Sequence, residues 1–227
     1  MKILKIKFSF KRIFILLLLL GTFGFFYTCS VSTRKTKILY KEAKKGKPYD
    51  VIIVPGYPFK DNTWNDLLKA RIFWSWFLYD RGIAKNIIYS GSAVSSPYIE
   101  SEIMLLYGKA LGIPSRNLYT ETQAEHSTEN VFYAYHKAKK LGFQRIALAT
   151  DPFQSKMLRK FVRRKLGKDV GFIPIIYDSL ANLDTLNIFI DPKTAFINNF
   201  VPLAERESFW KRFKGTRGEK IDYESFE

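Results

Sequence analysis

Residues 50–56, Asp-Val-Ile-Ile-Val-Pro-Gly, constrain the fold most, because four consecutive β-branched residues stand between an acid and a Pro-Gly pair. Such a run predicts a strand that is buried on both faces and ends in a tight turn. Residues 86–91 and 145–151 have the same form, a short apolar strand followed by small or polar residues. In a parallel sheet covered by helices, ligands bind just beyond the carboxyl ends of such strands. We therefore expect a functional site at that edge.

Strand and helix patterns alternate with short connections up to residue 177. Strands are predicted at 50–54, 86–90, 117–121, 145–150 and 171–177, and helices at 62–80, 98–111, 128–141 and 153–166. This alternation is typical of an α/β fold with a doubly wound, mainly parallel sheet, whose right-handed crossovers place the polar loops on one rim. Beyond residue 178 the pattern fades. Short helices are expected at 194–199 and 203–213, and the last dozen residues are expected to fray.

The N-terminus predicts a membrane-anchor helix. Residues 1–12 carry five basic residues and no acid, and residues 13–28 are almost wholly apolar. This is the layout of a signal sequence, although sixteen residues are short for the roughly 20 that span a bilayer. An uncleaved signal-anchor is the favoured interpretation. A lipoprotein signal with Cys29 as the lipidated residue is the alternative, although residues 26–28 are bulkier than such a processing site prefers.

The net charge of +16 belongs largely to this N-terminal arm. Residues 1–47 hold twelve Lys or Arg and one acid, Glu42, so they account for +11 of it. A basic arm beside an apolar segment favours membrane lipid as the partner of residues 1–47, and no nucleic-acid partner is expected because no reading motif is present. Four segments are predicted: 1–30 as signal-anchor or signal peptide, 31–48 as a basic tether, 49–215 as the folded domain and 216–227 as a C-terminal tail.

The expected location is the bacterial inner membrane, crossed once, with the domain outside the cytoplasm. Both flanks of the apolar segment are basic, so the positive-inside rule discriminates little, and the orientation rests on the signal-like layout. The single cysteine excludes an internal disulfide framework and a Cys-based zinc site.

Residues 121–130 are the most suggestive for chemistry, because they gather carboxylates, hydroxyls and an amide between a strand and a helix. A helix N-terminus suits a phosphate or carboxylate, and ordinary capping by Ser127 or Thr128 is the alternative interpretation. His126 is better placed for chemistry than the chain's other histidine. Glu102 and Glu129 would suit acid/base work or a metal if they met, which their spacing alone does not show. No metal and no cofactor is assigned.

A wider pattern covers about residues 49–180. It consists of residues 50–56, Arg71, Tyr89-Ser-Gly91, Ser101-Glu102, Gly112-Ile-Pro114, Glu121, Ser127-Thr-Glu-Asn130 and Ala149-Thr-Asp151. This order resembles the SanA/ElyC/YdcF family, also known as domain of unknown function 218. The resemblance implies a Rossmann-like three-layer fold, an N-terminal envelope anchor, and a role in cell-envelope integrity and in lipid-carrier or peptidoglycan metabolism. One branch of the family is linked to S-adenosylmethionine. By matching position it implies a pocket lined by Gly56, Arg71, Ser90, Gly91, Glu102, Thr128, Glu129 and Asn130.

The chain departs from the family pattern after the strand at 145–150. Gln154 stands where the family commonly has a histidine, and Met157 stands where an arginine follows. A glutamine can form hydrogen bonds but cannot shuttle a proton near neutral pH, so a mechanism that needs this histidine would have to use His126. Asp151 and Gln154 are still expected to contact the ligand.

These observations lead to one hypothesis and one alternative. The hypothesis is a membrane-tethered domain that binds a small anionic ligand, phosphorylated or nucleotide-like, in cell-envelope biogenesis or integrity. In its enzymatic form Glu102, Glu129 and His126 are catalytic and Arg71 is an anion clamp. The alternative is a non-catalytic ligand-binding or scaffold protein of the envelope.

Overall fold

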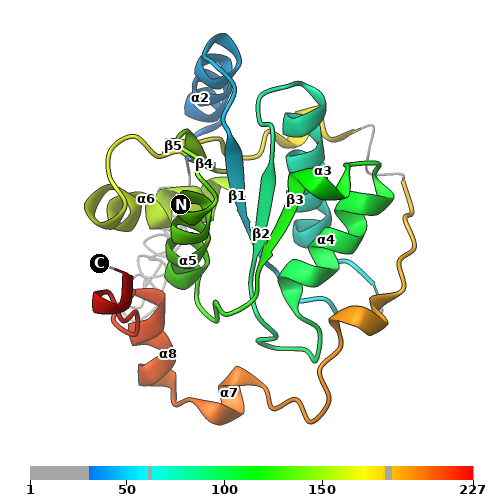
Figure 1. Cartoon of the computed structure of the whole chain (residues 1–227), viewed down its shortest axis with the longest axis vertical. Helices are drawn as coiled ribbons and strands as arrows, with labels where there is room; N and C mark the ends of the chain where they lie inside the picture. The colour runs from blue at the N-terminus through cyan, green and yellow to red at the C-terminus, as the bar shows by residue number, and fades with distance from the viewer. Residues whose placement is uncertain (1–30, 61–62, 182–185, 227) are drawn as a thin grey trace, which may run out of the picture.

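The computed structural model describes residues 31–60, 63–181 and 186–226. Its centre is a five-stranded, all-parallel sheet in the order β3-β2-β1-β4-β5 (Figure 1). The first strand is central and the chain winds outward in both directions, which confirms the predicted doubly wound α/β fold and makes it Rossmann-like. The strands are β1 (Val51–Pro55), β2 (Ile87–Ser90), β3 (Leu118–Glu121), β4 (Ile146–Leu148) and β5 (Gly171–Phe172).

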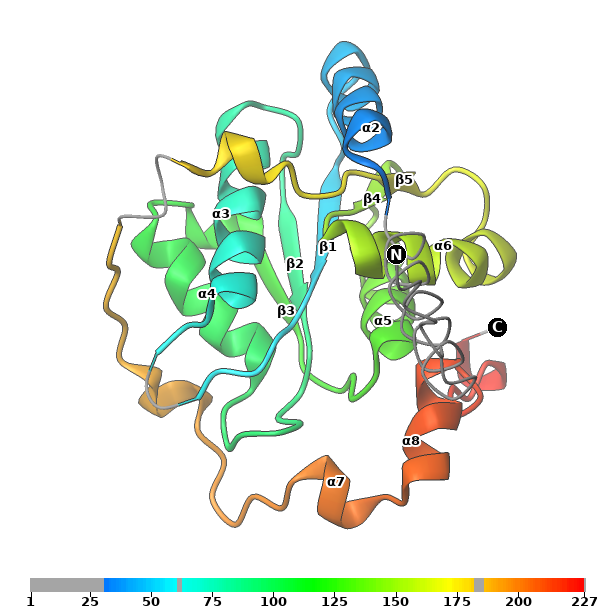
Figure 2. The same cartoon turned by 180° about the vertical axis from the view of Figure 1, so that it is seen from behind.

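Four helices cover the two faces of the sheet. Helices α3 (Asp66–Asp80) and α4 (Glu100–Ala110) lie on one face, and α5 (Ser127–Lys140) and α6 (Pro152–Lys165) lie on the other (Figure 2). Strand β1 divides its side chains between these layers: Ile52 and Val54 pack into the core under α3 and α4, and Val51 and Ile53 into the core under α5 and α6. All four are inaccessible to solvent, which explains the unbroken apolar run in the sequence.

The register of the sheet brings the ends of β1, β2 and β3 to one edge. Pro55 pairs with Ser90, and Ser90 pairs with Glu121. Gly56, Gly91 and the polar loop after β3 therefore follow at the same level. Helices α4, α5 and α6 begin at this edge, because each follows a strand of the parallel sheet. The observed helix and strand bounds lie within a few residues of the predicted ones; the largest shift at a helix start is in α3, which Asn65 caps through a 2.9 Å hydrogen bond from the N–H of Leu68.

Residues 31–48, expected as a tether, contain a regular helix, α2 (Thr33–Lys45). Ser32 caps its N-terminus, and Thr36 and Ala43, seven residues apart on one face, are buried. No helix in the described part of the chain has the length and apolarity to cross a membrane. The predicted anchor at 1–30, with Cys29, lies outside the described residues.

After β5 the chain crosses to the side of α3 and α4, and from residue 186 onward it passes α4 and runs along the carboxyl edge of the sheet toward α5 (Figures 1 and 2). Phe196 forms a bridge to Tyr98, and the N–H of Leu203 donates to the carbonyl of Val94 at 2.9 Å. The elements of this segment are η2 (Tyr177–Ser179), η4 (Pro192–Ala195), α7 (Leu203–Arg206), α8 (Phe209–Thr216) and η5 (Glu224–Phe226).

Three expectations for this C-terminal segment differ from the structure. The short helix expected at 194–199 is instead the 3-10 turn η4, which ends at Ala195 because Phe196 is extended and bridges to Tyr98. The single helix expected at 203–213 is broken at Glu207, whose backbone is extended because its buried side chain turns inward to Lys220. The last dozen residues were expected to fray, yet Ile221 is buried and Tyr223 and Phe226 pack edge-on against Phe132 of α5. Apolar side chains in an otherwise polar tail are the physical reason.

Candidate functional site

A cleft of about 340 Å³ opens at the carboxyl edge of the sheet, where the sequence predicted a site. It lies between the loop after β1, the loop before α5 and the first turns of α4 and α6. Six of the predicted site residues line it, and Glu100 lines it as well. The six are Gly56, Arg71, His126, Asn130, Asp151 and Gln154.

Arg71 is the buried cation of this cleft. It reaches from α3, and its Nη1 atom donates to the carbonyl oxygens of Pro55 at 3.1 Å and Gly56 at 2.6 Å. Its Nη2 atom pairs with Asp151 at 2.7 Å, and both side chains are less than one-tenth exposed. The Nε atom is buried and donates to no residue in the described part of the chain. Arg71 therefore holds a positive charge at the end of β1, and its Nε–H has no acceptor among the described residues.

Asp151 also determines how α6 begins. Its Oδ1 atom accepts the N–H of Gln154 at 2.8 Å, which is ordinary helix capping, while its Oδ2 atom holds Arg71. The side-chain oxygen of Gln154 accepts the hydroxyl of Thr150 at 2.5 Å. The first turn of α6 is thus held rigidly against the cleft, with Phe153 and Met157 half exposed at its border.

Glu100 is the cleft carboxyl group that sequence reasoning missed. It is the first residue of α4, is 5% exposed, and lies against two glycines that leave room for it. A Cβ atom on Gly56 would lie 2.5 Å from Oε2 of Glu100, and one on Gly91 would lie 3.0 Å from the same atom. Within the described residues its carboxyl group has no hydrogen-bond donor. Burial raises the pKa of Glu100 to about 8, against the opposing charge of Arg71, so the group carries a proton at neutral pH.

Glu102, the predicted catalytic carboxylate, points elsewhere. It lies two residues further along α4, about 200° around the helix axis, and so on a different face from Glu100. Its Oε1 atom accepts the hydroxyl of Thr120 on β3 at 2.7 Å, and it does not line the cleft. The two glutamates can be told apart only by knowing where α4 begins. Its N-cap residue is Ile99, whose side chain forms no capping hydrogen bond, so the sequence carries no capping signal at this position.

Ser90 lies beneath the cleft and positions Asn130. Its hydroxyl group is fully buried and contacts Oε2 of Glu121 at 2.5 Å and Oδ1 of Asn130 at 3.0 Å. The other oxygen of Glu121 accepts the N–H of Gln123 at 2.6 Å. Burial raises the pKa of Glu121, although these hydrogen bonds oppose the shift. Gly91 follows with φ of 148° and brings the backbone close to Glu100.

Thr128 and Glu129 build the turn before α5 and do not line the cleft. Glu129 accepts the backbone N–H of Glu125 at 2.9 Å and of His126 at 3.2 Å, so it closes the turn as a helix-capping glutamate. Burial raises its pKa. Thr128 donates to the carbonyl of Gly215 at 2.8 Å and so ties α5 to α8. Glu129 and Glu102 share no partner among the described residues.

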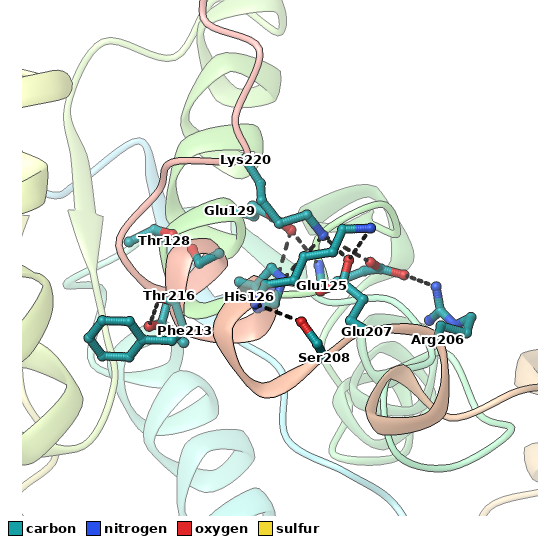
Figure 3. A network of polar contacts seen from close by, with 12 residues as sticks. Glu125, His126, Thr128, Glu129, Arg206, Glu207, Ser208, Phe213, Thr216 and Lys220 are labelled. Atoms are coloured by element: carbon teal, nitrogen blue, oxygen red, sulfur yellow. Dashed lines mark hydrogen bonds and ion pairs between the residues drawn. The ribbon is translucent and has the colours of Figure 1, made fainter.

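His126 lines the cleft but is covered by the C-terminal segment (Figure 3). Its Nε2 atom is 3.5 Å from Oε2 of Glu207 and 3.4 Å from Nζ of Lys220, and Gly215 of α8 packs against the ring. Burial would raise the pKa of Glu207, but the hydrogen bond and charge of Lys220 outweigh it and lower the pKa. The imidazole is therefore held by polar contacts with Glu207 and Lys220.

Comparisons with known proteins assign no family. No family model, no curated protein and no solved structure matches this chain. In the described part of the chain, no group of three or more His, Cys, Asp or Glu side chains is placed to hold a metal ion. The structure itself shows an α/β domain with a five-stranded parallel sheet and a cleft at its carboxyl edge.

Proposed function

We propose that the cleft binds a small anionic ligand, phosphorylated or nucleotide-like. The observation that carries this proposal is that a buried cation, Arg71, and a buried carboxyl group, Glu100, line the same cleft. Burial raises the pKa of Glu100 to about 8, which favours its protonated form. Three helices, α4, α5 and α6, begin at this edge, and the partial positive charge of their N-termini favours an anion there. The oxygens of a phosphate or carboxylate bind to hydrogen-bond donors and to positive charge, and these groups supply both.

Each group has a distinct part in this proposal. Asp151 holds the Arg71 guanidinium in place, so the cation needs no reorganisation when the anion arrives. Glu100, being protonated, donates a hydrogen bond to a ligand oxygen. In an enzymatic form water attacks the phosphorus of a bound ester, the ester P–O bond breaks, and Glu100 gives its proton to the leaving oxygen as a general acid; the proton released by the attacking water restores Glu100. The amide of Asn130, fixed by Ser90, orients the ligand. Glu100 thus takes the role that the sequence had suggested for Glu102.

The residue pattern supports placing the chain in the SanA/ElyC/YdcF family, domain of unknown function 218, and so in cell-envelope biogenesis or integrity. Five positions of that pattern gather at the carboxyl edge: Gly56, Arg71, Ser90, Gly91 and Asn130. The basic and apolar residues 1–28 support a single-pass tether to the bacterial inner membrane with the domain outside the cytoplasm, or lipid attachment at Cys29.

A non-catalytic binding protein is the second candidate. Two observations favour it: Gln154 and Met157 occupy the positions of the family's histidine and arginine, and His126 is engaged by Glu207 and Lys220. In this form the cleft recognises its ligand through the same Arg71 and Glu100 without a chemical step.

The test is titration calorimetry of the full-length protein in detergent. The panel consists of inorganic phosphate, phosphate monoesters, nucleotides and S-adenosylmethionine. Arg71→Lys keeps the charge but loses the forked geometry, so we expect affinity to fall roughly tenfold or more, the equivalent of one charge-assisted hydrogen bond. Glu100→Gln keeps the shape, so turnover of a bound ester should vanish while binding persists if Glu100 is catalytic.

Glu102→Gln is the matched control, because it changes the same residue type in the same helix outside the cleft. It should leave binding and turnover unchanged. An affinity loss in Glu102→Gln with none in Arg71→Lys or Glu100→Gln would contradict this assignment of the site. A Glu100→Gln variant that alters affinity alone, or nothing, would favour the binding protein.

A further inference from the structure

Helix α8 exposes an aromatic face that belongs to neither hydrophobic core. Phe209, Trp210 and Phe213 are 64%, 70% and 45% exposed. Their rings contact one another, with centroids 5.4 Å apart for Phe209 and Trp210 and 6.2 Å apart for Trp210 and Phe213. Contiguous apolar groups of this size on a protein surface mark an interaction site. We call these three residues the α8 aromatic face.

The charges around this face are positive. Helix α8 reads Phe-Trp-Lys-Arg-Phe-Lys-Gly-Thr and holds no acid, and Arg217 follows with its guanidinium 5.8 Å from the centre of the Phe213 ring. Two nearby acids are engaged in ion pairs: Glu207 with Lys220 and Lys211, and Glu219 with Arg217. Exposed Trp and Phe combined with Lys and Arg form the composition that binds the interface of an anionic bilayer.

The fold places α8 on the flank where the chain leaves toward residues 1–30. Val31, the first described residue, donates its N–H to the carbonyl of Pro152 at the start of α6, at 3.1 Å. The apolar stretch at 13–28 ends three residues earlier, a reach of roughly 10 Å at most. Helix α8 packs on α5, which covers the same face of the sheet as α6, and Figure 2 shows both on one side of the molecule.

We propose that the α8 aromatic face and its basic residues dock onto the surface of an anionic lipid bilayer. This inference rests on the proposed membrane tether, which would bring this flank to the bilayer. Gly215 of α8 touches His126, and His126 lines the cleft, so docking of α8 would also fix the cleft relative to the membrane. Phe153 and Met157, half exposed at the cleft border, lie in the first turns of α6, where Pro152 accepts the N–H of Val31.

The experiment places a spin label on the full-length chain in vesicles. The background carries Cys29→Ser, and Lys214→Cys is labelled on α8. Phe189→Cys is the control, because Phe189 is 91% exposed. It belongs to the segment 186–191 before η4, which lies on the side of the molecule opposite to α8 (Figure 2). Vesicles contain either zwitterionic lipid alone or one part in four of anionic lipid. Flotation measures membrane attachment, and the accessibility of the label to oxygen and to a water-soluble nickel complex measures its depth.

We expect the protein to float with both vesicle types and the label at 214 to enter the interface in anionic vesicles, with the oxygen-to-nickel accessibility ratio rising severalfold. The label at 189 should remain aqueous. The pair Phe209→Ser and Trp210→Ser should return the label at 214 to water without reducing flotation. Flotation with an aqueous label at 214 in anionic vesicles would overturn the docking and leave the tether standing. Cys29→Ser removes the site of lipid attachment, so the apolar residues 13–28 are the tether under test. Loss of flotation would overturn the tether through residues 13–28 and the docking that rests on it.

Discussion

Replacing Glu100 with glutamine should remove a loss of stability that the wild-type protein suffers as the pH rises. The free energy of unfolding of Glu100→Gln, compared with that of the wild type at the same pH, should therefore increase from acidic to neutral pH. Glu100 is buried, lacks a hydrogen-bond donor among the described residues, and has a pKa of about 8 in place of its ordinary 4.5. Between these two values the unfolded chain has released the proton and the folded protein keeps it. The free energy of unfolding therefore falls as the pH rises through this range.

The size of the effect follows from linkage. Each pH unit inside the range costs about 1.4 kcal/mol, so the wild-type protein should lose about 3 kcal/mol between about pH 5 and pH 7 through Glu100 alone. Below 4.5 and above 8 this contribution no longer changes with pH. Glu100→Gln has no proton to lose, so its stability should lack this slope.

The assay is urea unfolding of the full-length protein in detergent at a series of pH values, comparing the wild type with Glu100→Gln. The difference between the two curves isolates Glu100 from other groups that titrate in the same range. Glu102→Gln, in the same helix, should retain the wild-type slope. Parallel pH profiles for wild type and Glu100→Gln would refute the reasoning, because they would mean that the carboxyl group is already charged in the folded state.

Two further substitutions test how closely the edge is packed. Gly56→Ala places a methyl group 2.5 Å from the Glu100 carboxyl and 2.9 Å from the carbonyl oxygen of Ser90. Thermal unfolding should therefore show a free energy of unfolding lower by about 1–3 kcal/mol. The control is Gly46→Ala, whose methyl group would have its nearest atom 3.5 Å away and should cause little loss by steric overlap. In Gly215→Ala the added methyl group would overlap the His126 ring and push α8 outward. Limited proteolysis should then cleave this variant near α8 faster than the control Lys214→Ala, which changes an exposed residue of the same helix. Equal cleavage rates would count against this packing.

The sheet could be predicted from the sequence because its signals are local. The β-branched run 51–54 and the glycine and polar residues that follow each strand fixed both the buried strand and the edge where the cleft lies. Arg71, Asp151 and Gln154 line the cleft at that edge. They were named largely through the family resemblance, and their contact with a ligand stays a prediction.

The finer assignments depended on rotations and contacts that the sequence does not display. To choose between Glu100 and Glu102, one must know which face of α4 each residue occupies. Two residues along a helix correspond to a rotation of about 200°, so the two side chains point to different sides. Helix α2 was missed because its many lysines indicated a solvated tether, whereas buried Thr36 and Ala43 give it a packed side. The path of residues 196–220 depends on single backbone contacts, such as Leu203 with Val94, which leave no periodic pattern.

The path of the C-terminal segment has a consequence for biosynthesis. The five strands end at Phe172, so the sheet can assemble while residues 207–220 are still being translated. Those residues cover His126, which is one of the residues that line the cleft. A nascent chain would thus form its sheet before the residues that cover His126 are made. A chain that ends before Glu207 would keep all five strands but would leave His126 uncovered at the cleft. Quality control that inspects only the stability of the sheet would not distinguish such a product from the complete protein.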